Sequence, residues 1–306
     1  MTHLSVKIGT LDLRNPVMTA SGTFGFGVEM ASIIDLNRLG AVVVKSTSRE
    51  MRLGNPTPRI TETPSGLLNA IGLQNGGIDN YISEKAPFLR HFNVPIIVNL
   101  VGYSVDDYVY LAQRITAAGA ADALEINISC PNVKHGCDFS VDPLLTFELI
   151  DALRKATPLP LITKLSPNVT SILPIARAAI EAGTDGLALI NTLLGTAIDA
   201  RKRRFKLANV TGGLSGPAIK PVALRMVWQA HQAFPDIPIV GMGGITNGID
   251  AVEFLLAGAT AVAVGTATFV NPAASLGVLD GLEAYMDEYG IDDVRELIGA
   301  VKAIDD

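Results

Sequence analysis

One of the two cysteines, Cys130, lies between two asparagines in the stretch NISCPN (127–132). The preceding run ALEINIS (123–129) has the β-rich texture of a strand, and Pro131 lacks a backbone donor, so this strand is expected to stop at Ser129 or Cys130. A cysteine in mid-strand packs as a small hydrophobic side chain, whereas one at the junction of a strand and a loop is better placed for chemistry. Cys130 is therefore a candidate reactive residue.

Two lysines, Lys45 and Lys164, lie within two residues of the ends of other strand candidates. A cation is costly to bury there unless something anionic is held beside it, so the lysines predict a bound anion or a reduced cofactor. They could instead form Schiff bases, as in aldolases, but Cys130 and the neighbouring asparagines would then have no obvious part.

Polar residues or glycines end every strand candidate, whereas the strand interiors are almost wholly aliphatic. These end residues are Ser21, Lys45, Ser46, Asn99, Asn127, Cys130, Lys164, Ser166, Asn191, Thr192, Gly243, Gly244, Gly265 and Thr266. A single Ser or Thr at a strand end can simply meet water, but two lysines and three asparagines converging together are hard to obtain from packing alone. Asparagine amides donate and accept together, which suits a planar ligand with alternating N–H and C=O groups.

The glycines after the last two strand candidates predict a phosphate site. Backbone amides at 243–244 and 265–266, each opening onto a helix, would form the phosphate cradle that barrels place after their seventh and eighth strands. GMGGIT (241–246) is a weak dinucleotide motif, because Thr246 stands at the third glycine position and the next strand follows too soon for an acidic ribose ligand. Together, the phosphate cradle, the anion-stabilising lysine, the amide-rich pocket and the cysteine suggest an FMN enzyme that reduces or oxidises a small heterocycle.

Eight short apolar runs supply the strands that would position these groups. They are residues 17–21, 41–46, 95–100, 123–129, 160–166, 186–192, 238–244 and 261–267. Helix-period segments lie between them, several of which end in a glycine that can cap the helix: 106–120, 142–156, 172–184, 220–234 and 247–259. Apolar strands alternating with amphipathic helices require a parallel sheet covered by helices, and eight repeats predict an α/β fold closed into a (β/α)₈ barrel, with a doubly wound open sheet as the alternative.

Two connections, roughly 47–94 and 193–237, are longer than one helix and two turns require, and insertions of that size often cover a site. The 306 residues show no low-complexity linker and no change in composition that would mark a second domain. We therefore expect a single domain over residues 1–306.

The composition narrows the classes of partner and compartment. With a net charge of −6 and 18% charged residues, the chain has no generalised attraction for nucleic acid or anionic lipid, so small-molecule or protein partners are expected. Two cysteines form no disulfide framework and the four histidines show no paired ligand spacing, which predicts a reducing compartment and no structural metal.

Neither a signal peptide nor a membrane span is expected. The N-terminal stretch MTHLSVKIG has no apolar core of signal-peptide length, which predicts a cytoplasmic protein. Residues 254–279 carry no charge, but Gly258, Gly265 and Pro272 divide them into a helix end, a strand and a loop, so no membrane association is predicted.

Ten sequence motifs follow one another along almost the whole chain. They are NPVMTASGTFGFG (15–27), VVKSTS (43–48), GNPTPRI (54–60), NAIGLQNGG (69–77), EINISCPNVKHG (125–136), TKLSPNV (163–169), ALINTLLG (188–195), NVTGGLSGPAIKP (209–221), GMGGI (241–245) and AVAVGTA (261–267). In this order they resemble the successive signatures of class 1 dihydroorotate dehydrogenases, specifically the catalytic subunit of the NAD-linked branch.

The resemblance implies oxidation of dihydroorotate to orotate on FMN in pyrimidine biosynthesis. Cys130 would be the base, a hydride would leave the neighbouring carbon for the flavin, and Lys45 is the obvious cation to favour the thiolate. The implied substrate-binding residues are Lys45, Asn69, Ala70, Ile71, Gly72, Leu73, Asn127, Asn132, Asn191 and Thr192. The implied FMN-binding residues are Ser21, Lys45, Ser46, Asn99, Asn127, Lys164, Ile190, Gly216, Gly243, Gly244, Gly265 and Thr266.

One loop departs from the family pattern. Relatives usually continue SCPNVKHG with a second glycine and a Phe-Gly pair, whereas here residues 137–140 read CDFS in a slightly shorter loop. The loop over the substrate could therefore move differently, although Cys130 and both flanking asparagines are intact. Cys137 is interpreted as an incidental loop residue, with a second redox-active thiol as the alternative.

Electrons must leave the reduced flavin through another chain, because the sequence lacks both the cysteine set of an iron–sulfur cluster and a convincing NAD fingerprint. The resemblance implies a partner subunit carrying FAD and a [2Fe–2S] cluster, in a heterotetramer built on a homodimer of catalytic subunits. The absence of an N-terminal amphipathic or spanning helix argues against the quinone-linked class. A fumarate-using homodimer is less firmly excluded.

Two further alternatives stay open at this point. A flavin-dependent RNA-modifying reductase would need a basic face, and the run Arg201 to Arg204 with Lys206 is the candidate, although such a run in an acidic chain is more typical of a solvated loop. A barrel that serves only as an assembly subunit is the non-enzymatic alternative.

Overall fold

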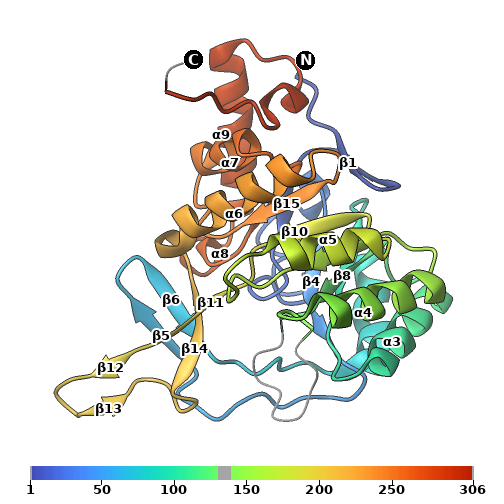
Figure 1. Cartoon of the computed structure of the whole chain (residues 1–306), viewed down its shortest axis with the longest axis vertical. Coiled ribbons are helices and arrows are strands. Elements are labelled where there is room, and N and C mark those ends of the chain that lie inside the picture. The colour runs from blue at the N-terminus through green and yellow to red at the C-terminus, as the bar shows by residue number, and fades with distance from the viewer. Residues whose placement is uncertain (1, 130–138, 305–306) are drawn as a thin grey trace.

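Eight parallel strands form the centre of the protein in a computed structural model that describes residues 2–129 and 139–304 (Figure 1). They run in the order β3, β16, β15, β10, β9, β8, β7 and β4. Their bounds are β3 (Val17–Thr19), β4 (Val42–Thr47), β7 (Ile96–Leu100), β8 (Ala123–Asn127), β9 (Leu161–Lys164), β10 (Gly186–Leu189), β15 (Ile239–Met242) and β16 (Ala261–Val264).

The two outermost strands of that order also meet. Met18 forms a parallel bridge with Ala41, just before β4, and the Gly40 amide donates to the Val17 carbonyl at 2.8 Å. The strands therefore follow one another in chain order around a barrel, without the reversal of order that a doubly wound sheet requires. The predicted (β/α)₈ barrel is confirmed, and all eight strand candidates are strands of it.

All five predicted helices are present between the strands. They are α3 (Val105–Ala117), α4 (Pro143–Ala156), α5 (Leu173–Glu181), α6 (Lys220–Ala233) and α7 (Gly248–Leu256), and α9 (Ala274–Tyr289) follows the last strand. Local chemistry sets their ends: the Ser104 side chain accepts from the Asp107 amide at the start of α3, and Gly119 and Gly183 take positive φ angles of 58° and 96° just after α3 and α5.

Shorter helical segments complete the connections. Between β4 and β7 lie α1 (Gly77–Asn80), the π-helix η2 (Tyr81–Lys85) and α2 (Ala86–Leu89), and α8 (Ala267–Val270) precedes α9. The 3₁₀ helices are η1 (Leu36–Arg38), η3 (Pro217–Ile219) and η4 (Val294–Leu297). Between β3 and β4, where every residue is described, the chain forms turns and η1 in place of an α-helix.

The two long connections pair with each other. The first contributes β5 (Ile60–Thr63) and β6 (Gly66–Asn69), and the second contributes β11 (Leu193–Thr196) and β14 (Thr211–Ser215). They form one antiparallel sheet in the order β11, β14, β6, β5, which we call the accessory sheet. Figure 1 shows it projecting beside the barrel, with the hairpin of β12 (Ile198–Asp199) and β13 (Arg204–Phe205) at its outer end.

A hairpin near the N-terminus, β1 (Val6–Ile8) with β2 (Leu11–Leu13), lies against the starts of the barrel strands. A Cβ atom placed on Gly186, the first residue of β10, would come within 2.8 Å of the Ile8 side chain. Because Ile8 and Leu13 are buried, the hairpin closes this end of the core.

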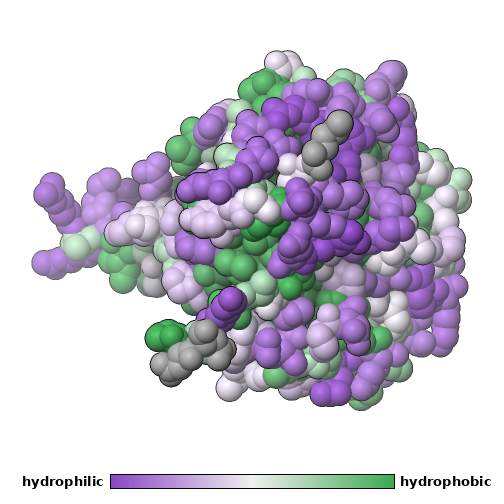
Figure 2. Space-filling model, turned by 90° about the horizontal axis from the view of Figure 1, so that it is seen from above, coloured by the Kyte–Doolittle hydropathy of each residue, from purple (hydrophilic) through white to green (hydrophobic). Residues whose placement is uncertain are grey.

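Hydrophilic side chains predominate on the face shown in Figure 2, with smaller hydrophobic areas between them. Among the residues that the structure describes, no helix combines the length and the apolar character needed to cross a bilayer.

Candidate functional site

Lys164 and Glu125 form a buried ion pair near the C-terminal ends of β9 and β8. The Lys164 Nζ lies 3.3 Å from the Glu125 Oε1, and the two side chains are 7% and 3% exposed. The same ammonium donates to the Ser21 Oγ at 3.4 Å, just beyond β3 on the opposite side of the barrel. Ser21 and Lys164, predicted from separate strand ends, therefore meet across the barrel mouth.

Asn99 joins this pair from β7. Its Nδ2 donates to the Glu125 Oε1 at 2.5 Å. The side chain is fully buried, and its Oδ1 has no hydrogen-bond partner within the described part of the chain. The buried Ser129 Oγ also has no partner among these residues. A buried polar atom without a partner costs about 1–3 kcal/mol, so these two atoms point to a ligand that would satisfy them.

Asn127 and Asn191 bring two more amides to the same mouth. The Asn191 Nδ2 donates to the Asn127 Oδ1 at 3.1 Å, and the Ser129 amide donates to that oxygen at 3.2 Å. The Tyr108 hydroxyl from α3 holds the Asn127 carbonyl at 2.6 Å. These hydrogen bonds fix the Asn127 amide at the end of β8.

Thr192 is tied to Asn191 and to the loop after β9. Its amide donates to the Asn191 Oδ1 at 2.8 Å, and its carbonyl accepts from the Asn168 Nδ2 at 3.1 Å. Ile190, which precedes these residues, is buried and donates its amide to the Met242 carbonyl of β15 at 3.1 Å. The segment after β10 is thus anchored on both sides.

Lys45 lies within β4, next to the buried Ser46. Burial lowers the pKa of its ammonium group, the positive charge of Arg59 lowers it further, and Glu29 partly offsets both. In the described ranges 2–129 and 139–304, no carboxylate lies within ion-pair distance of Lys45. An anionic ligand would stabilise the charged form of the Lys45 ammonium.

The predicted phosphate-binding glycines converge from three loops. A Cβ on Gly244 would lie 2.9 Å from the Gly216 carbonyl oxygen, and one on Gly216 would lie 3.6 Å from the Thr266 Cγ2. Gly216, Gly243 and Gly244 have positive φ angles of 93°, 128° and 82°, which side chains disfavour. The Thr266 Oγ1 donates to the Ser215 Oγ at 2.7 Å, which ties the loop after β16 to the end of β14.

Gly265 continues this arrangement toward β3, because a Cβ on it would contact the Ala20 side chain at 3.5 Å. Behind the glycines, the Lys220 ammonium at the start of α6 pairs with Asp250 at 2.6 Å and with Glu253 at 2.7 Å, both on α7. Glycine amides in close-packed loops, with an ion pair behind them, fit a phosphate group.

The accessory sheet brings the predicted run 69–73 toward the barrel mouth. Asn69 of β6 lies in register with Gly213 of β14, and a Cβ on Gly213 would collide with the Thr192 side chain at 2.0 Å. Ala70 and Ile71 are held by Asn55, whose side chain donates to the Ala70 carbonyl at 3.0 Å. Gly72 and Leu73 follow with φ angles of 76° and 58°.

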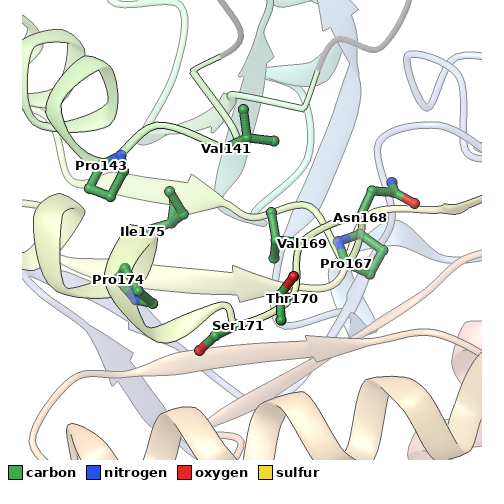
Figure 3. A pocket seen from close by; sticks show the side chains of 9 residues that line it. All are labelled: Val141, Pro143, Pro167, Asn168, Val169, Thr170, Ser171, Pro174 and Ile175. Carbon is green, nitrogen blue, oxygen red and sulfur yellow. The ribbon is translucent and has the colours of Figure 1, made fainter.

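Two cavities border the mouth. A cavity of about 810 Å³ lies between the starts of α4 and α5 and the loop after β9 (Figure 3). It is lined by Val141, Pro143, Pro167, Asn168, Val169, Thr170, Ser171, Pro174 and Ile175. A second, of about 440 Å³, is lined by residues 48–55, Gly72, residues 101–103 and Asp107. Asn168 and Gly72 connect these cavities to the site, but neither lysine of the mouth lines them.

Comparison with known proteins identifies the family. The family model for dihydroorotate dehydrogenase matches residues 3–286. The chain belongs to the dihydroorotate dehydrogenase family. It is 58% identical over 300 residues to "Dihydroorotate dehydrogenase B (NAD(+)), catalytic subunit" of Trichlorobacter lovleyi, covering 98% of both chains. Proteins of the same name are 56% identical in Geotalea uraniireducens, over 97% of this chain and 98% of the relative, and 55% identical in Alkaliphilus metalliredigens, over 98% and 99%.

Family membership makes the protein an oxidoreductase, so the alternative of a purely structural barrel is dropped. The resemblance to the NAD-linked branch is confirmed by the names of these relatives. Two of the residues that the resemblance selected, Cys130 and Asn132, lie outside the described residues, as does Cys137.

Sequence reasoning missed two members of the site. Glu125 was passed over inside an apolar run, although an acid two positions before Asn127 shares its face of the strand and is unusual among aliphatic residues. Ser215, the partner of Thr266, gave a weaker signal because it lies in an insertion whose pairing is not visible locally. The dihydroorotate dehydrogenase motifs EINISCPNVKHG and NVTGGLSGPAIKP contain both residues.

Proposed function

We propose that this protein binds FMN and oxidises dihydroorotate to orotate in pyrimidine biosynthesis, acting as the catalytic subunit of an NAD-linked enzyme. The observation that carries the proposal is the mouth of the barrel, where the Asn99 Oδ1, which has no partner among the described residues, lies beside the buried Lys164–Glu125 pair. Membership of the dihydroorotate dehydrogenase family indicates which reaction this polar site supports.

The residues around the mouth fit FMN. The amides near Gly216, Gly243, Gly244, Gly265 and Thr266 would hold its phosphate, because a side chain on either Gly216 or Gly244 would enter the space where they converge. The Asn99 Oδ1 would accept from a ring N–H, and Lys164 would offset negative charge on the reduced ring. When bound, FMN supplies the acceptor for two electrons.

Lys45 and the amide cluster would bind the substrate. The ammonium of Lys45, whose pKa is lowered by burial, gains a counter-charge from the orotate carboxylate. Asn69, Asn127 and Asn191 present amide donors and acceptors to a ring that alternates N–H and C=O groups, with residues 70–73 and Thr192 beside them. Asn132 is proposed as a further contact.

The proposed chemistry removes one proton and one hydride from neighbouring ring carbons. The Cys130 thiolate takes the proton from the carbon next to the carbonyl, while the hydride leaves the adjacent carbon and a C=C bond forms between them. The substrate thereby loses two electrons and two hydrogens. Lys45 is the proposed cation that favours the thiolate, since a free thiol is mostly protonated at neutral pH.

A second subunit is proposed to carry the electrons onward. The relatives are named catalytic subunits of an NAD(+) enzyme, which supports a separate partner and NAD as the final acceptor. We propose that the partner carries FAD and a [2Fe–2S] cluster and that two catalytic subunits form the core of a cytoplasmic heterotetramer. The relatives' names favour this over a fumarate-using enzyme. We also propose that the 306 residues form one domain.

The basic run gives little support to an RNA-modifying enzyme. Residues 201–203 form the turn between β12 and β13, and the Asp199 side chain accepts from the Arg201 and Lys202 amides at 3.1 Å. The turn is therefore organised by its own acidic residue at the exposed end of a hairpin. Tight, salt-sensitive retention of tRNA on a filter would revive that alternative.

The test is an anaerobic titration of the purified protein, which we expect to be yellow, with dihydroorotate. The flavin should bleach, and Cys130→Ser should slow bleaching at neutral pH by about 10²–10⁴-fold, the usual contribution of a general base. Added NAD should reoxidise the flavin rapidly only in the complex with the partner subunit. A wild-type flavin that dihydroorotate does not bleach contradicts the proposed substrate, and equally fast bleaching in the variant removes Cys130 as the base.

A further inference from the structure

Glu125 is an acid with no assigned part in the chemistry, yet it lies at the centre of the mouth. In the sheet it is in register with Asn99 of β7, while Asn127, two residues further on, is in register with Lys164 of β9. One carboxylate oxygen, Oε1, accepts from both the Asn99 Nδ2 and the Lys164 Nζ. Burying a carboxylate costs free energy, so its hydrogen bonds to these two partners must offset that cost.

The carboxylate dictates which way the Asn99 amide faces. An ionised carboxylate can only accept hydrogen bonds, so the amide must turn its Nδ2 toward Glu125 and its Oδ1 away from it. The reverse orientation would place two acceptors in contact. The Oδ1 is buried and has no partner among the described residues, so a ligand that offers a donor at this point would satisfy it.

The same carboxylate holds the Lys164 ammonium. Lys164 is 7% exposed, and in the described ranges its polar contacts are the Glu125 Oε1 and the Ser21 Oγ. Glu125 therefore both fixes the position of this ammonium and offsets part of its charge, so less positive potential reaches a flavin in the mouth than an unpaired lysine would give.

We propose that Glu125 is a positioning residue that presents the Asn99 oxygen to a ring N–H of the flavin and restrains the charge of Lys164. This inference rests on the proposed function, because it takes the ligand at the mouth to be FMN. Glu125 would thereby select a ligand that offers a hydrogen-bond donor at this point. It would also give the flavin a lower reduction potential than Lys164 alone would set.

The first measurement is the reduction potential of the bound flavin in Glu125→Gln. Removal of the negative charge beside Lys164 should move the potential to more positive values, because the reduced, more negative flavin is stabilised. Lys164→Gln should move it to more negative values. Asp185→Asn removes one carboxylate at the opposite end of the barrel, where it pairs with Arg154, and should leave the potential unchanged.

The second measurement is a double-mutant cycle of FMN affinity with Asn99→Ala. A glutamine at position 125 satisfies either orientation of the Asn99 amide and no longer selects one, so Glu125→Gln alone should weaken FMN binding by about 10-fold, the value of one hydrogen bond. In the Asn99→Ala background the same change should cost no more than about 3-fold, because the residue through which it acts is gone.

An unchanged potential together with additive losses of affinity would overturn the inference. These outcomes differ from a failure of the proposed function, in which the wild-type protein itself neither holds FMN nor is bleached by dihydroorotate. If Glu125→Gln does not fold, the charge-balanced pair Glu125→Gln/Lys164→Gln goes through the same cycle: non-additivity with Asn99→Ala supports the inference, and additivity overturns it.

Discussion

The two ends of the barrel carry similar polar side chains but use them differently. At the N-terminal ends of the strands, Asp122 accepts from the Ile96 amide at 2.7 Å and pairs with Arg90, and Asp185 accepts from the Leu161 amide at 2.8 Å and pairs with Arg154. At the C-terminal ends, the buried Asn99 Oδ1 and Ser129 Oγ have no partner within the described part of the chain.

This difference separates stabilisation from binding. A carboxylate that caps a strand and pairs with an arginine has its hydrogen bonds satisfied within the chain, so it contributes to folding alone. An amide oxygen or an ammonium that is buried without a counterpart costs stability until a ligand arrives. Substitutions at the N-terminal ends should therefore change stability alone, whereas substitutions at the mouth should change ligand binding as well.

The largest effect is expected at the mouth, from Lys164→Met. It leaves the Glu125 carboxylate buried without its cation, and breaking a buried pair in this way costs about 3–5 kcal/mol. We expect a lower free energy of unfolding in urea and weaker binding of FMN. Lys155→Met, which removes an exposed lysine paired with Asp151 on α4, is the matched control and should behave as wild type. Retention of full stability and full FMN in Lys164→Met would break the comparison.

The next effect is expected at the opposite end, from Asp185→Asn. The change weakens the ion pair with Arg154 and the cap on the Leu161 amide, so the free energy of unfolding should fall by about 1–3 kcal/mol. Orotate affinity, measured on folded protein by flavin absorbance, should not change. A large loss of affinity with unchanged stability would show that the two ends are not separate in function.

A pH titration of orotate binding should give a smaller effect that sharpens the assignment of Lys45. Burial and Arg59 lower the pKa of Lys45 in the free protein, and the protonated form is the one that pairs with the orotate carboxylate. Affinity should therefore be highest below that lowered pKa and should fall as pH rises through it, by up to about 10-fold per pH unit. Lys45→Arg keeps its charge at high pH and should lose this dependence. A pH-independent wild type would remove Lys45 from the carboxylate site.

The smallest effect concerns the ion pair behind the glycine loops. Burial alone would raise the pKa of Asp250, but hydrogen bonds from Lys220 and Thr246 outweigh it and hold the pKa below its usual value. The stabilisation is therefore present above the ordinary Asp pKa of about 4 and is lost as pH falls through the lowered value. Lys220→Met should be less stable than wild type at pH 7 by at most about 1 kcal/mol, and the two urea curves should converge on acidification. A difference that persists at low pH would contradict this account.

Local patterns predicted the barrel well because its strands are short apolar runs and its helices have a clear period. The strand ends were placed slightly too late: the run 123–129 yields a strand that stops at Asn127, whose own side chain accepts from the Ser129 amide and turns the chain. The pairing of β6 with β14 could not be predicted, because it joins residues 69 and 213 and has no local signal.

The sequence predicted which types of residue gather at the site better than it predicted their contacts. Lysines and asparagines were found because polar residues interrupt aliphatic runs at the strand ends. Which atoms remain unsatisfied depends on contacts across the barrel, such as that between Ser21 and Lys164, which no linear pattern contains. Glu125 was missed for the same reason, since its importance comes from neighbours on two other strands.

The accessory sheet makes the two insertions dependent on each other in length. A one-residue deletion in β6 would turn Asn69 to the other side of the sheet and remove its alignment with Gly213. Grafting either insertion from a distant homologue should therefore impair the protein, whereas exchanging both together should preserve the alignment. The two segments therefore act as one structural unit although they lie far apart along the chain.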